Sequence, residues 1–185
     1  PAQAVLVSPK TGVVDLGVVP KGKTAQSKVM LQNIGGEAAV LAAQAASFIG
    51  RSVDQNPNQP FFAYISTFAP HAPATPAPRH AAAYPGATAP RTPSWNELDL
   101  SDKPAWVQAL PVLDTTQIAD IDKLYRHRLQ SLLAVDELVG QIVATLQAKG
   151  ELERTYIVFT SDNGYHMGQH RMDSGKMTAF EEDLW

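Results

Sequence analysis

The spacing of apolar positions predicts two helices and two buried strands in the larger part of the chain. Apolar residues recur at helical spacing over residues 37–50 and again over about residues 117–149. Two short, continuous runs of aromatic and β-branched residues, Phe61–Ser66 and Thr155–Thr160, are typical of strands buried on both faces. The order of these elements predicts an α/β fold in which the two strands are neighbouring or near-neighbouring parallel strands with a right-handed connection.

The longer predicted helix has capping signals at both ends and one apolar face. Asp114, Thr115 and Thr116 offer N-terminal caps, and Gly150 is a natural terminator. The apolar positions recur at steps of three and four, as in an amphipathic helix. They are Ile118, Ile121, Tyr125, Leu129, Leu132, Leu133, Val139, Ile142, Val143 and Leu146.

Two further stretches have a different character. Residues 1–36 contain short apolar runs with a period of two, separated by glycine pairs, which predicts a short β segment. This segment resembles strands of an immunoglobulin-like repeat, and a β-hairpin joined to the next domain is an equally good interpretation, because a complete sandwich needs about 100 residues. In residues 69–111, frequent prolines forbid a long helix or a central strand. Irregular connections of this length are usually functional or disordered.

Composition indicates a globular chain and excludes several classes of protein. Apolar residues make up 44% of the chain and charged residues 18%. The net charge of −3 offers no basic surface for nucleic acid. No apolar run approaches the roughly 18 residues of a membrane span, so we expect no segment that crosses a bilayer. The absence of cysteine excludes disulfides, zinc–thiolate sites and a cysteine nucleophile within these 185 residues.

Polar residues that could carry chemistry come after both predicted strands. In open α/β sheets, functional sites lie at the carboxyl ends of the strands. The first predicted strand is followed by His71, and the second by Asp162 and Asn163. A carboxylate and an amide oxygen on adjacent loop residues suit a hard cation such as calcium or magnesium. Asp-Asn-Gly is also a common turn, and His71 and Lys176, taken singly, are compatible with ordinary surface side chains.

A zinc pair is a further interpretation of the same region. His166 and His170 have the spacing of two ligands on one helical face, but Gly168 between them disfavours a helix. None of these features determines the function by itself. Their order and spacing along the chain are more informative.

Taken together, the motifs resemble the type I sulfatases of the alkaline phosphatase superfamily, over about residues 37–185. The stretch Ser94–Pro104 looks like the corresponding segment of the glucosamine-6-sulfatase and arylsulfatase branch. Several separated motifs occur in the order and spacing of the family, which makes the resemblance specific. The other matching segments are Phe61–Ala77, Tyr125–Leu129, Ser131–Asp136, Gly150–Leu152, Thr155–Gly164, Gly168–His170 and Gly175–Lys176.

The resemblance implies a role for each matched residue. Asp162 and Asn163 would be calcium ligands, and His71 would contact the sulfate or the leaving-group oxygen as a general acid. Lys176 would neutralise charge that develops on the sulfuryl oxygens, which a fixed cation can stabilise. His170 would support the site from a second layer.

The sequence also departs from the family. The nucleophile of the family is a formylglycine made from a Cys/Ser-x-Pro-x-Arg motif beside two metal-binding aspartates, and these 185 residues contain no such motif. The chain begins with Pro1 and ends at Trp185 directly after an acidic run, so we expect a piece of a longer protein. We therefore expect the chain by itself to be inactive.

These observations lead to one interpretation with two alternatives. We expect a partial alkaline-phosphatase-like α/β domain over residues 37–185, with a mostly parallel sheet, preceded by the β segment of residues 1–36. The resemblance implies hydrolysis of a sulfuric ester, with a sulfated carbohydrate or aryl sulfate as substrate, in a secreted, periplasmic or lysosome-like compartment. The alternatives are a phosphate or phosphonate ester hydrolase of the same superfamily and a non-catalytic binding or scaffold protein.

Overall fold

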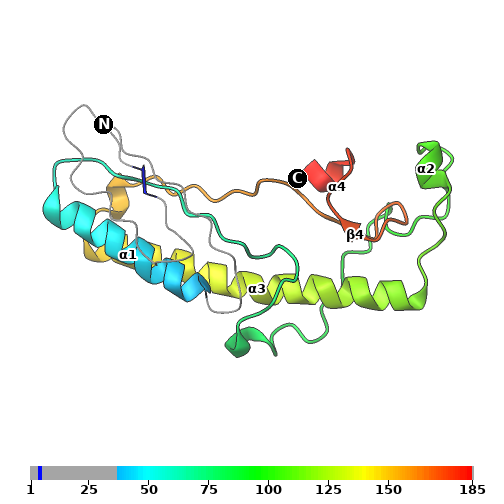
Figure 1. The fold of residues 1–185 in the computed structure, drawn as a ribbon, viewed down its shortest axis with the longest axis horizontal. Coiled ribbons are helices and arrows are strands. Elements are labelled where there is room, and N and C mark those ends of the chain that lie inside the picture. Colours follow the sequence, from blue (N-terminus) through cyan, green and yellow to red (C-terminus); the bar gives the residue numbers. More distant parts are fainter. Residues whose placement is uncertain (1–3, 6–36, 185) are drawn as a thin grey trace. The chain divides into compact units, whose positions relative to one another are not determined.

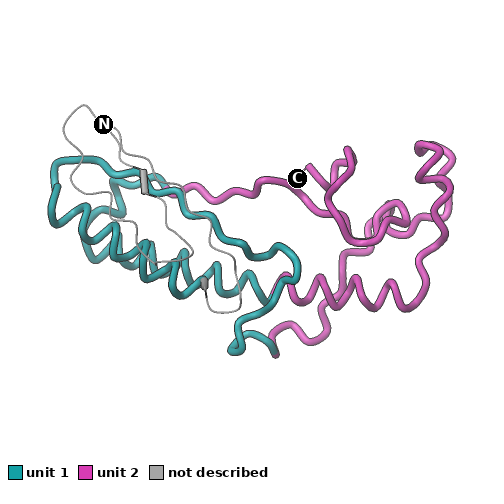
Figure 2. Tube along the Cα trace, in the orientation of Figure 1, with its two compact units in different colours: residues 1–81, 130–156 teal, residues 82–129, 157–185 magenta. Residues whose placement is uncertain are grey.

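The computed structural model describes residues 4–5 and 37–184, which divide into two compact units (Figures 1 and 2). Unit 1 comprises Pro1–Ala81 and Gln130–Tyr156, and unit 2 comprises Ala82–Leu129 and Ile157–Trp185. Except for residues 4–5, the predicted β segment of residues 1–36 lies outside the described residues.

Unit 1 is built around the packing of two helices. The alanine-rich stretch forms α1 (Glu37–Gln55), which confirms the first predicted helix and extends it by about a turn. Leu41 of α1 packs with Leu138 of α3 (Thr115–Ala148), and each such buried leucine contributes about 1.5–3 kcal/mol through removal of its apolar surface from water. The unit also contains β1 (Ala4–Val5), β2 (Phe62–Ala63), η1 (Pro78–His80) and η2 (Leu152–Arg154).

Unit 2 has its own small apolar cluster at the beginning of α3. Ile121 is 1% exposed and packs with Ala89, Leu113 and Met167. The short elements of this unit are α2 (Ala105–Gln108), β3 (His166–Met167), β4 (Ser174–Gly175) and α4 (Glu181–Leu184).

The long helix α3 confirms the sequence prediction at both ends. Asp114 Oδ1 accepts hydrogen bonds from the main-chain N–H groups of Thr116 (2.8 Å) and Gln117 (2.9 Å), and Gln117 Oε1 accepts one from the N–H of Asp114 (3.0 Å). This reciprocal pair is a capping box, which satisfies N–H groups that have no partner inside the helix. At the other end, Gly150 takes a φ of +69°, a left-handed conformation that stops the helix without a steric penalty.

The expected mostly parallel sheet is not confirmed by the described residues. Only Phe62–Ala63 of the first predicted strand pairs, in parallel with β1, and β3 pairs with β4 in antiparallel fashion. The second predicted strand, Thr155–Thr160, belongs to neither sheet. Its aromatic residues Tyr156 and Phe159 are 99% and 74% exposed. A strand forms only beside a partner, and no described segment pairs with this run.

The apolar composition of α3 bears on the expectation that no segment crosses a bilayer. Among the described helices, α3 is long and apolar enough to cross a bilayer by length and composition alone. Core helices satisfy the same criterion, and Glu137 within α3 forms an ion pair with Arg79 and lies 2.9 Å from His80 Nε2. Because a charged side chain is unfavourable inside a bilayer, and because Leu138 packs against α1, the contacts favour a helix of the protein core.

The packing of α1 on α3 generates a stability prediction. Leu138 is 3% exposed, so Leu138→Ala removes buried apolar surface and should lower the free energy of unfolding by about 2–5 kcal/mol. Leu98 is 82% exposed, so the matched change Leu98→Ala should alter it by less than about 0.5 kcal/mol. Chemical denaturation followed by circular dichroism measures both, and equal effects would contradict this core.

Candidate functional site

The structure places three of the four predicted site residues in unit 2 and brings two of them into contact. Asp162 and Asn163 lie in the loop before β3, and Lys176 directly follows β4. Lys176 Nζ donates a hydrogen bond to Asn163 Oδ1 at 3.3 Å. The antiparallel pairing of β3 with β4 accounts for this approach, because it returns the chain past the loop from which β3 starts.

His71 belongs to unit 1. Its main-chain N–H donates to Phe68 O at 2.8 Å, and its oxygen accepts from the N–H of Ala74 at 2.8 Å, so it lies in a tight turn. The exposed imidazole packs against the ring of Phe68, with 4.7 Å between centroids, and its Nδ1 lies 2.9 Å from Ala72 O. The convergence of His71 with the residues of unit 2 stays a prediction.

The oxygens of the Asp162–Asn163 loop fit a calcium site in part. The carboxylate of Asp162 is exposed, its Oδ1 accepts the main-chain N–H of Asn163 at 3.0 Å, and the amide oxygen of Asn163 accepts from Lys176. Oxygen donors of this kind suit calcium, which takes about 6–8 of them. In residues 37–184, no three His, Asp or Glu side chains gather in a way that could hold a metal. These two side chains can therefore supply part of a ligand set.

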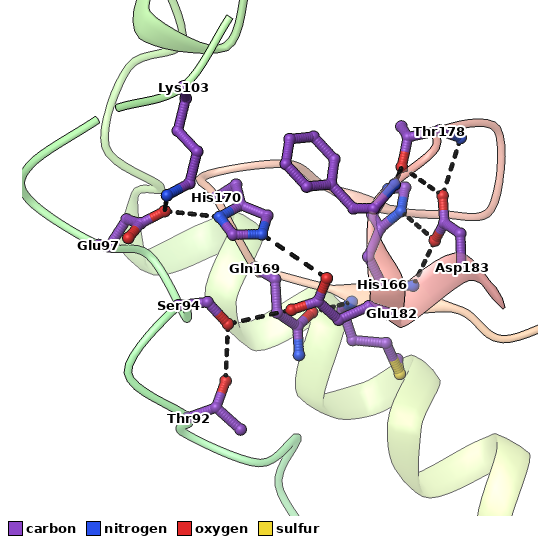
Figure 3. A network of polar contacts seen from close by, with 12 residues as sticks. Thr92, Ser94, Glu97, Lys103, His166, Gln169, His170, Thr178, Glu182 and Asp183 are labelled. Carbon is purple, nitrogen blue, oxygen red and sulfur yellow. Dashed lines mark hydrogen bonds and ion pairs between the residues drawn. The ribbon is translucent and has the colours of Figure 1, made fainter. Parts of the chain in front are cut away.

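A buried His–Asp pair contacts the end of this loop, where the main-chain oxygen of Asp183 accepts the N–H of Gly164 at 2.9 Å. Asp183 is 3% exposed, and its Oδ1 accepts hydrogen bonds from the ring Nδ1 of His166 at 2.7 Å and from the His166 main-chain N–H at 3.1 Å (Figure 3). Oδ2 accepts the Thr178 hydroxyl at 2.6 Å and the Thr178 N–H at 2.8 Å. Burial by itself would raise the pKa of Asp183, but the hydrogen bonds from Thr178 and His166 outweigh it and hold that pKa below its usual value.

A second buried histidine joins the segment around residue 97 to α4 (Figure 3). His170 is 7% exposed, its Nδ1 lies 2.5 Å from Glu97 Oε1, and its Nε2 lies 3.6 Å from Glu182 Oε2. Glu182 also accepts the hydroxyl of Ser94 at 3.1 Å. His166 and His170 each contact a different carboxylate, and neither lies in a helix. This arrangement argues against the zinc pair that their spacing allowed.

The stretch Ser94–Pro104 is attached to residues 167–171, which follow the Asp162–Asn163 loop, by hydrogen bonds from side chains to main-chain oxygens. Trp95 Nε1 donates to Met167 O at 3.1 Å, and the guanidinium of Arg171 donates to the main-chain oxygens of Glu97 (2.8 Å) and Leu98 (2.6 Å). This stretch and residues 167–171, shortly after the candidate site loop, therefore form one hydrogen-bonded assembly.

Sequence reasoning missed the carboxylates that hold this assembly. In the sequence, Asp183 and Glu182 are simply part of an acidic run at the end of the chain, and Glu97 is one residue of a longer motif. The histidines in this glycine-rich loop were the signal in the sequence that pointed to such carboxylates. A buried imidazole needs a polar partner, and an acidic side chain can provide one.

Comparison with known proteins identifies several sulfatases as similar proteins. The family model named Sulfatase matches residues 21–184. An arylsulfatase of Volvox carteri is 43% identical over 147 residues, which cover 68% of this chain and 23% of that protein. The N-acetylglucosamine-6-sulfatase of Capra hircus is 40% identical over 127 residues, covering 69% and 23%. The chain thus spans less than a quarter of the length of these relatives.

A solved structure shows a similar fold. The crystal structure of yidJ from Bacteroides fragilis, assigned as a sulfatase, superposes with a TM-score of 0.58 and 27% sequence identity. The match covers 80% of this chain and 29% of that protein. The comparisons do not support the immunoglobulin-like resemblance of residues 1–36, and the family match begins inside that segment.

A pair of glycine substitutions tests the assembly around Trp95. Gly168 has a φ of +103°, and a Cβ there would lie only 2.9 Å from Trp95 Cδ1, so Gly168→Ala should lower the free energy of unfolding by about 1–3 kcal/mol. The matched change Gly140→Ala lies in α3 with nothing within 4 Å of its new Cβ, and it should raise stability by roughly 0.5–1 kcal/mol. Denaturation followed by tryptophan fluorescence reports both, and a Gly168→Ala protein as stable as wild type would contradict the close approach.

Proposed function

The chain belongs to the sulfatase family, and from this membership we propose that it forms part of an enzyme that hydrolyses sulfuric esters. The observation that carries the proposal is the contact of Lys176 with Asn163, next to Asp162, in the loop that the family motif matches. A sulfated sugar is the proposed substrate class. The name of the Capra hircus relative, N-acetylglucosamine-6-sulfatase, supports this choice. The family resemblance favours a secreted, periplasmic or lysosome-like compartment.

The proposed roles follow from charge and geometry. The oxygens of Asp162 and Asn163 would hold part of the coordination sphere of a calcium ion, and such a cation would supply charge stabilisation for a sulfate group. Lys176 Nζ lies 3.3 Å from Asn163 Oδ1. At this distance, one bound anion could contact both the ammonium of Lys176 and a cation coordinated by Asn163 Oδ1. Its positive charge would stabilise the sulfuryl oxygens as charge develops on them. His71 would donate a proton to the leaving oxygen.

The proposal for this chain is limited to the metal-binding and sulfate-binding part of the site. The 185 residues contain no cysteine and no Ser-x-Pro-x-Arg motif, so they do not supply the formylglycine that the family uses. Positioning groups and a cation do not replace a nucleophile. The chain alone is therefore expected to bind substrate-like anions without turning them over.

One test of the proposed function uses the isolated chain. The purified protein, given an aryl sulfate and calcium, should release no phenol and should bind calcium weakly, because two oxygen ligands are a minor part of the about 6–8 that calcium takes. Colorimetric assay and titration calorimetry are the measurements. Turnover that disappears in Asp162→Ala would reveal a nucleophile in this chain. It would contradict the proposal that these residues supply only the metal-binding and sulfate-binding part of the site.

Another test examines the function itself in a chimera. Residues 37–184 would replace the matching segment of the Volvox carteri arylsulfatase, whose other residues would supply the rest of the site. The chimera should hydrolyse an aryl sulfate in a calcium-dependent way. Lys176→Ala within it should lower kcat by roughly 10²–10³-fold, the loss typical of one group that stabilises developing charge.

A matched lysine controls for the loss of a positive charge. Lys123 lies exposed on α3 in the same unit, and Lys123→Ala should leave kcat unchanged. A chimera that folds but is inactive would contradict the proposed function. Equal rates for the Lys176→Ala and wild-type chimeras would remove Lys176 from the mechanism.

A further inference from the structure

Asp183 is a buried carboxylate whose hydrogen-bonding capacity is fully used. Its two oxygens accept four hydrogen bonds, two from His166 and two from Thr178. A carboxylate buried without such partners would be strongly unfavourable, so its position is fixed by the groups that donate to it. Because the ionised carboxylate only accepts, the ring proton of His166 lies on Nδ1.

The same residue holds the loop that carries Asn163. The main-chain oxygen of Asp183 accepts the N–H of Gly164, the residue directly after Asn163, at 2.9 Å. Two residues further along, His166 donates both its main-chain N–H and its ring Nδ1 to the carboxylate. The loop is thus attached to Asp183 at two points on the carboxyl side of Asn163.

The segment that carries Lys176 is held from both sides by the same pair. Thr178, two residues after Lys176, donates its N–H and its hydroxyl to Asp183 Oδ2 (Figure 3). Gly175, directly before Lys176, pairs with His166 in the sheet. A Cβ on Gly175 would lie 2.8 Å from His166 Nε2, so the imidazole lies directly against this backbone.

We propose that Asp183, acting through His166 and Thr178, is a positioning residue that sets the separation between Asn163 and Lys176. This inference rests on the proposed function for its catalytic meaning. Asp183 forms no hydrogen bond with the side chain of Asn163 or Lys176 in the described part of the chain, but it connects the two segments that carry these residues. Such precision matters in catalysis, because a displacement of about 1 Å can lower a rate by about 10²-fold.

The test uses the ¹⁵N-labelled 185-residue chain and two substitutions at one position. Thr178→Val keeps the side-chain shape and removes the hydroxyl donor, whereas Thr178→Ser keeps the donor. In Thr178→Val, the Gly164 and His166 amides should exchange with solvent on the order of tenfold faster, the loss expected for one hydrogen bond to a charged group. The side-chain amide signal of Asn163 should shift, and Thr178→Ser should restore both readouts.

Two further variants separate positioning from general stability. Thr145→Val removes a threonine hydroxyl that donates to Gln141 O at 2.7 Å within α3, and it should leave the Asn163 signal unchanged. Gly175→Ala displaces the His166 ring while leaving Thr178 intact, and it should accelerate Gly164 exchange as Thr178→Val does. It provides the readout if Thr178→Val does not fold.

The outcomes are distinguishable. An unchanged Asn163 signal and unchanged Gly164 exchange in folded Thr178→Val or Gly175→Ala would overturn the positioning role. Unfolding of both variants would also overturn it, in favour of a purely structural role for Asp183. Neither readout involves sulfate hydrolysis, so an inactive chimera would contradict the proposed function and leave this result unaffected.

Discussion

Burial of apolar side chains along α3 is the constraint on which both units depend. The beginning of the helix gives Ile121 to the cluster of unit 2, and its second half gives Leu138 to the packing of unit 1. Each cluster is small, and outside α1 and α3 the described residues are irregular or lie in elements of two to four residues. Helix α3 has 34 residues, a capping box at its beginning and a left-handed glycine directly after its end. The loops of both units are therefore attached to this helix.

Unit 2 adds contacts between histidines and carboxylates to its small apolar core. His166 contacts Asp183, 17 residues further along the chain, and His170 contacts Glu97, 73 residues earlier in the sequence. Charge-assisted hydrogen bonds are directional, unlike apolar contacts, so they specify a single arrangement of irregular backbone. This property suits the proposed site, in which a few polar atoms would need fixed separations.

The sequence allowed prediction of the features that depend on neighbouring residues. Helices α1 and α3 are determined by local spacing and caps, and the family motif identified the segment around Asn163 and Lys176. Features that depend on distant partners were not predictable. Asp183 becomes a connecting residue only because Thr178 and His166 fold around it. Buried positions of α3 such as Leu138 lay off the predicted face, because its second half packs against another helix.

The exposed run Thr155–Thr160 has a consequence for handling the protein. It is rich in β-branched and aromatic residues, carries no charge or proline, and Val158 is 83% exposed. A segment of this kind readily adds to the edge of a sheet in another molecule, which makes it a nucleus for aggregation at high concentration. Arg154 and Asp162 flank it as charged gatekeepers that oppose such stacking. Solubility of the isolated chain should therefore depend on this short run more than on its overall charge.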